Sequence, residues 1–346
     1  MISAANPALR ASPAGQLKPA ELATVFDAAF WHAVLPVCVR AAKAALAGDA
    51  AEDKSAAGET VDVLGKATDR VTYLAARGLM LTHQGERAMT AFRDAAVDGI
   101  VVKGATFARY LYPEPALRTF TDIDVIIRPE HRAKTGEIMR SLGFELHTFE
   151  DRVGKDYFED KWKLASQNNM IVEVHANLVH SPKLRGYMSL TYDDIFAAGD
   201  GNPEAPEALL LIAGAHGAIG HQFDKLQHLV DVLRAATGRA VDVSRLRRAA
   251  LRSGVMLPLV AALDLAGRAF GAQEALGLAR QLDSSIVTRM AGRLLSPQLV
   301  ITAQSETRNR GSWRRKTFRQ LLRLDAKRRG PLDVPRERAG AAPAAT

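Results

Sequence analysis

Apolar residues recur at helical spacing in the first quarter of the chain. From Glu21 onward they follow one another at intervals of three and four residues, which is the spacing of an amphipathic helix. A more polar segment over residues 48–60 separates this helix from a second long helical stretch over residues 61–96. We therefore expect a loose arm, rich in Ala, Pro and Ser, over residues 1–20 and a helical lobe over residues 21–96.

Short apolar runs replace the helical repeat after Gly99. The run over residues 100–102 predicts a strand, and alternating side chains over residues 122–127 predict another. Residues 161–178 are typical of a hairpin whose turn is the polar segment at residues 167–169.

The helical repeat returns beyond this hairpin. The sequence thus predicts the α+β class, in which a small mixed sheet and its helices form a core over residues 97–183. Helical lobes flank this core on both sides, and the C-terminal lobe is expected over residues 184–300. A basic, partly disordered tail is expected over residues 301–346.

Charge is concentrated in that tail. The 346 residues carry a formal net charge of +8, but residues 308–338 alone hold twelve basic and three acidic residues. The rest of the chain is therefore nearly neutral, at about −1. Two interpretations of the tail stay open. A basic helix around Trp313 and Phe318 contacts nucleic acid or an anionic surface, or it packs its apolar side on the body.

Composition excludes several classes of protein. The single cysteine, Cys38, excludes a disulfide scaffold and any metal site built from cysteines. Aromatic residues, at 6%, are too sparse for a typical reader of single-stranded nucleic acid. No segment has the pattern of a secretory signal or a transmembrane segment, so we expect a cytoplasmic protein with a buried, inert thiol.

Three carboxylates form the group that carries chemistry. Strand alternation places Asp122 and Asp124 on one face, where their oxygens can chelate a hard divalent cation. Glu173 lies in an apolar strand, and burial there is unfavourable unless a cation or a hydrogen-bonding partner compensates. A third carboxylate on a neighbouring strand lets two ions be shared, as in phosphoryl or nucleotidyl transfer.

Lys103 and Gly104 lie where the first strand leads into a helix. Free backbone N–H groups at the positive end of a helix favour phosphate, glycine permits close approach, and lysine adds a positive charge. Such a turn, or an isolated Asp-x-Asp that caps a strand, is weak evidence alone. Their joint occurrence with Glu173 is what favours a catalytic site.

The combined pattern resembles a known family. The run VVKGATFARYLYPEPALRTFTDIDVIIRPEHRAKTGEIMRSLGF, followed by VEVHANL, is similar to the uncharacterised nucleotidyltransferases of the DNA polymerase β superfamily. In that family a Lys-Gly turn, an Arg before Asp-x-Asp, a helix ending in Gly-Phe and a Glu-x-His strand recur in this order. The resemblance covers about residues 95–270 and continues into AHGAIGHQFDKLQHLVDV. It implies a polymerase β-like core, two Mg²⁺ ions and a nucleoside triphosphate.

The resemblance also assigns residues to roles. Two aspartates and a third carboxylate, which can also act as general base for the acceptor hydroxyl, bind the metal ions: Asp122, Asp124 and Glu173. The nucleotide is held by Lys103, Gly104 and Arg118. The chain departs from the wider superfamily, whose Gly-Ser turn lies closer to its aspartates, because seventeen residues, 105–121, separate Gly104 from Asp122.

Further polar residues are candidates for the border of the substrate cleft: His175, Lys163, His216, His221 and Asp231. Lys161 and Lys163 alternate onto the strand face beside Glu173, where they neutralise phosphate or are simply solvated. His216 and His221 are five residues apart. On an α-helix this spacing turns them to different sides, so a metal site from these two alone is not expected.

Two functions from different classes follow. The leading hypothesis is a Mg²⁺-dependent nucleotidyltransferase that transfers an NMP group from an NTP such as ATP to an unknown acceptor hydroxyl and releases pyrophosphate. The alternative is a non-catalytic nucleotide-binding or partner-docking protein that retains the fold, with the tail over residues 308–338 contacting nucleic acid or an anionic surface. The presence of all three acidic residues favours the enzyme.

Overall fold

The computed structural model describes residues 1, 5, 17–48, 54–150, 157–302 and 312–332 of the 346-residue chain. Most of the expected N-terminal arm therefore lies outside the described residues. Residues 303–311 and 333–346 of the expected basic tail also lie outside the described residues.

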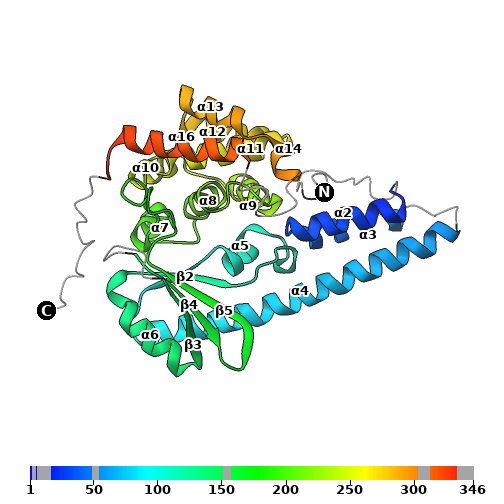
Figure 1. The fold of residues 1–346 in the computed structure, drawn as a ribbon, viewed down its shortest axis with the longest axis horizontal. Coiled ribbons are helices and arrows are strands. Elements are labelled where there is room, and N and C mark those ends of the chain that lie inside the picture. Colours follow the sequence, from blue (N-terminus) through cyan, green and yellow to red (C-terminus); the bar gives the residue numbers. More distant parts are fainter. Residues whose placement is uncertain (2–4, 6–16, 49–53, 151–156, 303–311, 333–346) are drawn as a thin grey trace.

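Three helices form the N-terminal part of the fold: α2 (Pro19–Trp31), α3 (Leu35–Gly48) and α4 (Lys54–Asp94). The long helix predicted from residue 61 begins seven residues earlier, and Gly58 lies inside it. One glycine in a helix costs only about 1 kcal/mol relative to alanine, which the Ala-rich first turns of α4 offset. In Figure 1, α4 runs from α2 and α3 to the underside of the sheet.

The sheet has five strands in the order β1-β2-β5-β4-β3. Their bounds are β1 (Gly99–Val102), β2 (Ile123–Ile127), β3 (Phe144–Glu150), β4 (Glu159–Leu164) and β5 (Gln167–His175). β2 and β5 are parallel, whereas the other neighbouring pairs are antiparallel. The small mixed sheet expected within an α+β fold is thus confirmed.

Two details of the sheet differ from the sequence-based expectation. The edge strand β3 was not predicted, and the hairpin turn lies at Ala165–Ser166 rather than at the QNN segment. Leu164 pairs with Gln167, so QNN forms the first residues of β5. The register of β4 and β5 shifts between Lys163 and Leu164, so the two asparagines lie in the irregular first part of β5.

The two faces of the sheet differ in polarity. One face is apolar and packs against α4 and α6 (Arg132–Ser141), with side chains such as Ile123, Val125 and Val172 fully buried. The opposite face carries charged side chains from β2, β4 and β5 and is directed toward the C-terminal helices (Figure 1). Helix α5 (Gly104–Leu111) follows β1 directly. Short 3-10 turns at Pro115–Leu117 and Pro129–His131 lie on either side of β2.

The C-terminal helices surround α11, whose apolar residues are almost all buried. These elements are α7 (Tyr192–Ala198), α8 (Pro206–Ala215), the π-helix η4 (His216–Gly220), α9 (Leu226–Thr237), α10 (Val243–Arg252), α11 (Met256–Phe270), α12 (Gln273–Leu282), α13 (Ile286–Leu294) and α14 (Pro297–Ile301). Cys38 is 3% exposed and burial raises the pKa of its thiol to about 11, as expected for an inert core cysteine.

The basic segment forms helix α16 (Trp313–Arg329), which lies on the C-terminal lobe (Figure 1). Phe318 and Leu322 are buried, whereas Trp313 is 66% exposed. Arg315 is 2% exposed and donates hydrogen bonds to the carbonyls of Gln222, Phe223 and Leu299 at 3.0–3.1 Å. The apolar side of this helix therefore packs on the body. Among the described residues, no helix combines the length and apolar content needed to cross a membrane.

We predict that Arg315→Ala destabilises the protein by about 2–3 kcal/mol, because the buried carbonyls that Arg315 satisfies lose their donor. Thermal and denaturant unfolding measure the change. Lys316→Ala is the matched control, since Lys316 is exposed on the same helix. Equal unfolding midpoints for the two variants would contradict this role of Arg315.

Candidate active site

The register of the sheet brings charged residues from three strands into one row. Asp124 of β2 pairs with Glu173 of β5, which pairs on its other side with Lys161 of β4. Two residues further along β5, His175 pairs with Glu159 of β4. Because side chains alternate along a strand, these residues share the polar face of the sheet.

Asp124 is the centre of this row. Its Oδ1 accepts from Lys103 Nζ at 2.7 Å and from His175 Nε2 at 3.0 Å, and all three residues are buried. Burial alone would raise the pKa of Asp124, but the Lys103 charge and the hydrogen bond from His175 hold that pKa well below its usual range. The Asp124 carboxylate is therefore ionised at neutral pH.

Lys103 reaches Asp124 because of the antiparallel register of β1 and β2. Val102 pairs with Asp124, so the next residue of the chain stands beside the carboxylate. Lys103 has φ +57°, a backbone conformation that is unfavourable for residues other than glycine. The next residue, Gly104, packs closely, since a Cβ there would lie 3.3 Å from the Asp122 carbonyl oxygen.

Glu173 completes an acidic group with one histidine. Its carboxylate contacts Lys161 Nζ at 2.9 Å and lies 3.7 Å from His175 Nε2. One potential ligand atom each from Asp124, Glu173 and His175 lies within 4.8 Å of the others. Two carboxylates at this spacing offer the oxygen ligands that Mg²⁺ prefers.

Asp122 precedes the first residue of β2 and lies outside that compact group. Its carboxylate forms no hydrogen bond or ion pair with any residue that the structure describes. Burial, followed by the negative charge of Asp124, raises the pKa of Asp122 to about 6. A buried carboxylate that has no hydrogen-bonding partner among the described residues and lies near a second carboxylate is suited to bind a cation. The residues present therefore fit a divalent metal ion.

The structure places Arg118 and Asp231 in a buried ion pair. Arg118 donates to both carboxylate oxygens of Asp231, at 3.0 and 2.9 Å, and to the carbonyl of Gly104 at 3.0 Å. Tyr112 also donates to Asp231, at 2.8 Å. This network joins the Lys103–Gly104 turn to α9, and Arg118 acts on the turn through its backbone.

The remaining candidates occupy different places. Lys163 pairs with Ile171 in the sheet, and its Nζ lies 3.0 Å from His147 Nε2, so Lys161 is the lysine beside Glu173. The expectation that His216 and His221 point to different sides is wrong. The segment between them is a π-helix, in which residues five apart lie one turn apart, and their ring centroids are 4.6 Å from each other.

Two residues near the acidic group escaped the sequence analysis. Glu159 accepts a hydrogen bond from His180 Nδ1 at 3.0 Å and lies 3.4 Å from Lys161 Nζ. The hydrogen bond from His180 holds the pKa of Glu159 well below its usual range. A signal for Glu159 was present, since it stands two residues before Lys161 and alternates onto the same face.

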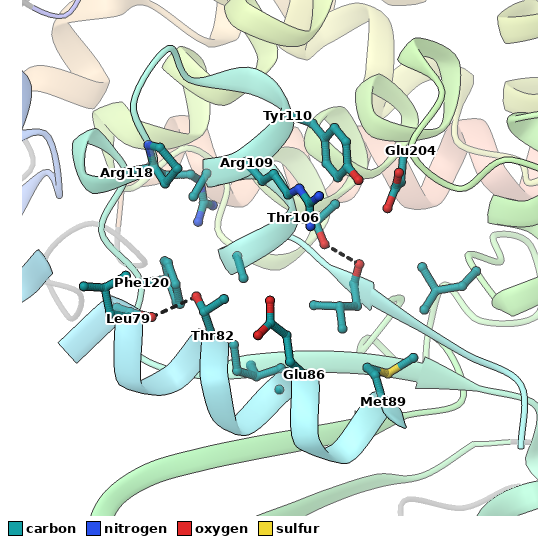
Figure 2. Close-up of a pocket in the computed structure, with 18 of the residues that line it drawn as sticks. Leu79, Thr82, Glu86, Met89, Thr106, Arg109, Tyr110, Arg118, Phe120 and Glu204 are labelled. Atoms are coloured by element: carbon teal, nitrogen blue, oxygen red, sulfur yellow. Dashed lines mark hydrogen bonds between the residues drawn. The ribbon is translucent and has the colours of Figure 1, made fainter. Parts of the chain in front are cut away.

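A separate cavity of about 970 Å³ lies between α4 and α5. In Figure 2, Leu79, Thr82, Glu86 and Met89 extend from α4, and Thr106, Arg109 and Tyr110 from α5 on the opposite side. Its lining includes Arg118 but neither Asp124 nor Glu173. The cavity and the acidic group are therefore distinct features, and Arg118 borders the cavity.

The α+β fold with its small five-stranded mixed sheet is consistent with a nucleotidyltransferase-like core. A family model described as uncharacterised nucleotidyltransferase matches residues 19–271, well over half of the chain, so the protein belongs to that family. The match confirms the resemblance found in the motifs and extends it to the N-terminal helices. No curated protein and no solved structure matches the chain.

We predict that Asp122→Asn stabilises the metal-free protein at pH 7.5 by roughly 1–3 kcal/mol, because the wild type must hold this carboxylate ionised beside Asp124. The folded-state pKa, about 6, exceeds the ordinary aspartate pKa of 3.8. The stability of the wild type relative to the variant therefore falls as the pH rises from about 4 to about 6. Thermal unfolding of both proteins across this range checks the prediction, and a difference that is independent of pH would refute it.

We also predict that Arg118→Met and Asp231→Asn each destabilise the fold by about 3–5 kcal/mol, since each leaves a buried group without its partner. The double variant should lose less than the sum of the two single losses. Arg40→Met is the control, because its 3.1 Å ion pair with Glu114 is exposed and should contribute under about 1 kcal/mol. Additive losses in denaturant unfolding would show that the pair is not coupled.

Proposed function

We propose that the protein is a Mg²⁺-dependent nucleotidyltransferase that transfers an NMP group from an NTP to an acceptor hydroxyl. The observation that carries this proposal is the pairing of Asp124 with Glu173 across the sheet, next to the buried Lys103, with Asp122 near enough for both carboxylates to raise its pKa. Membership of a nucleotidyltransferase family supports the reaction class.

The reaction assigns tasks to these residues. The acceptor oxygen forms a bond to the α-phosphorus, the bond from that phosphorus to the bridging oxygen breaks, and pyrophosphate leaves. Asp122, Asp124 and Glu173 would hold Mg²⁺, which supplies the positive charge that stabilises the attacking and leaving oxygens. Glu173 would also accept the proton of the acceptor hydroxyl, since a carboxylate is a suitable general base.

Lys103 binds the triphosphate in this proposal. Its ammonium group neutralises Asp124 in the ligand-free protein and lies at the N-terminus of α5, where backbone N–H groups also favour anions. Arg118 positions the turn by holding the Gly104 carbonyl. The protein's contribution is thus mainly the orientation and charge neutralisation of substrates.

The test uses α-labelled ATP, GTP, CTP and UTP with Mg²⁺ and a cell extract as the source of acceptors. We predict label transfer by the wild type, and a loss on the order of 100-fold or more in Asp124→Asn and Glu173→Gln. Glu137→Gln, an exposed position on α6, is the control and should keep full activity. Circular dichroism establishes that the inactive variants are folded.

Calorimetry separates this function from a non-catalytic docking role. The enzyme should show Mg²⁺-dependent affinity for at least one triphosphate, and Asp124→Asn should lose the metal dependence. A wild-type protein that neither transfers label nor binds any triphosphate with Mg²⁺ would rule out the proposed function.

A further inference from the structure

Three histidines gather in the C-terminal lobe, apart from the acidic group. One ring nitrogen each of His216, His221 and His228 lies within 4.8 Å of the others. The three ring centroids are 4.5, 4.6 and 5.4 Å apart. Imidazoles that share one tetrahedral ion at Zn–N distances of about 2.0–2.1 Å have centroids roughly 5 Å apart. The rings therefore already have the spacing of a three-histidine metal site.

The backbone adopts unusual conformations that bring the rings together. The π-helix η4 aligns His216 with His221. Gln222 and Phe223 then take left-handed conformations, with φ +47° and +56°, and return the chain toward His228 in the first turn of α9. Two successive residues in this region are strained, and such strain persists where the surroundings hold it in place. Here the buried Arg315 binds both carbonyls.

Gly217 permits this close packing. A Cβ at this position would lie 3.1 Å from the Phe223 ring and 3.3 Å from the Cβ of His228. A larger residue would therefore push α9 away from η4. The glycine keeps His228 within reach of the other two rings.

Asp224 lies beside two of the rings. Its Oδ1 lies 3.6 Å from His221 Nδ1 and 3.4 Å from His228 Nδ1. Among the described residues, this oxygen has no partner of hydrogen-bonding geometry. A carboxylate that accepts from Nδ1 directs Nε2 toward a metal, an arrangement common around metal-bound histidines, so a bound ion would draw these rings onto Asp224.

An ion can reach the histidine group from solvent. The side chain of His221 is 34% exposed, which gives an ion access from solvent. The Lys103 charge acts on His216, so the group lies near the nucleotide-binding turn.

We propose that His216, His221 and His228 form a binding site for a borderline divalent metal ion of the Zn²⁺ type, oriented by Asp224. Nitrogen ligands select such ions, whereas the carboxylates of the sheet suit the hard Mg²⁺. Three protein ligands leave a fourth position for water or an anionic group. This site is independent of the proposed transferase activity.

The test titrates Co²⁺, a spectroscopic substitute for Zn²⁺, into the chelator-treated full chain. We expect one ion per chain with the visible absorption of four-coordinate Co²⁺, displaced by Zn²⁺ but not by excess Mg²⁺. His216→Asn, His221→Asn and His228→Asn should lose this signal, and Asp224→Asn should weaken affinity by about 10–100-fold. His221→Asn is the decisive variant because its partly exposed position tolerates change, and circular dichroism checks its fold.

Three controls localise the ion. His83→Asn removes an exposed histidine and should bind Co²⁺ as the wild type does. Asp124→Asn and His180→Asn should also retain the signal, since they belong to the acidic group and to its neighbouring pair. The proposal is overturned if the wild type binds no stoichiometric Co²⁺, if His221→Asn keeps the signal, or if the signal follows His180 or Asp124.

Discussion

The buried negative charge of Asp124 is the constraint on which the site depends. A carboxylate at 5% exposure is unfavourable unless charged partners compensate, and here Lys103 and His175 do so. Compensation requires β1 to pair with β2 in a register that sets Lys103 beside the carboxylate. It also requires the strained backbone of Lys103, which turns the chain from β1 into α5. The burial of Asp124, the register of β1 on β2 and the strained backbone of Lys103 therefore all depend on one another.

The Arg118–Asp231 pair links that charge to the helical lobe. Arg118 holds the Gly104 carbonyl on one side and Asp231 of α9 on the other. The residue that anchors the turn therefore also fixes α9, whose first turn carries His228. One buried ion pair thus holds both the Lys103–Gly104 turn and α9.

The sequence alone predicted those features of the site that depend on the local periodicity of side chains. Two-residue alternation predicted that Asp122 and Asp124 lie on one face of their strand, because it depends only on strand geometry. That Glu173 lies beside Asp124 follows from the pairing of β2 with β5. Alternation did not predict that Arg118 would bind Asp231, which is 113 residues away and is brought near only by tertiary packing. The histidine group was missed for a different reason. Residues five apart point to different sides of an α-helix, but His216–Gly220 is a π-helix, in which such residues lie on the same side. The edge strand β3 was missed because its residues follow a helix with only Leu142 and Gly143 between.

One arginine of the basic helix α16 has a structural role that the net charge does not show. Most arginines of α16 are at least partly exposed, but Arg315 is buried and binds the carbonyls of Gln222 and Phe223. Those carbonyls belong to the strained loop that carries His221 and Asp224, so the tail helix stabilises the histidine group rather than standing apart from it. A cation that already satisfies buried carbonyls is not available to an external anion. The net charge of +8 therefore does not by itself indicate a nucleic-acid partner. At least one of the basic residues that contribute to it, Arg315, forms its hydrogen bonds inside the protein.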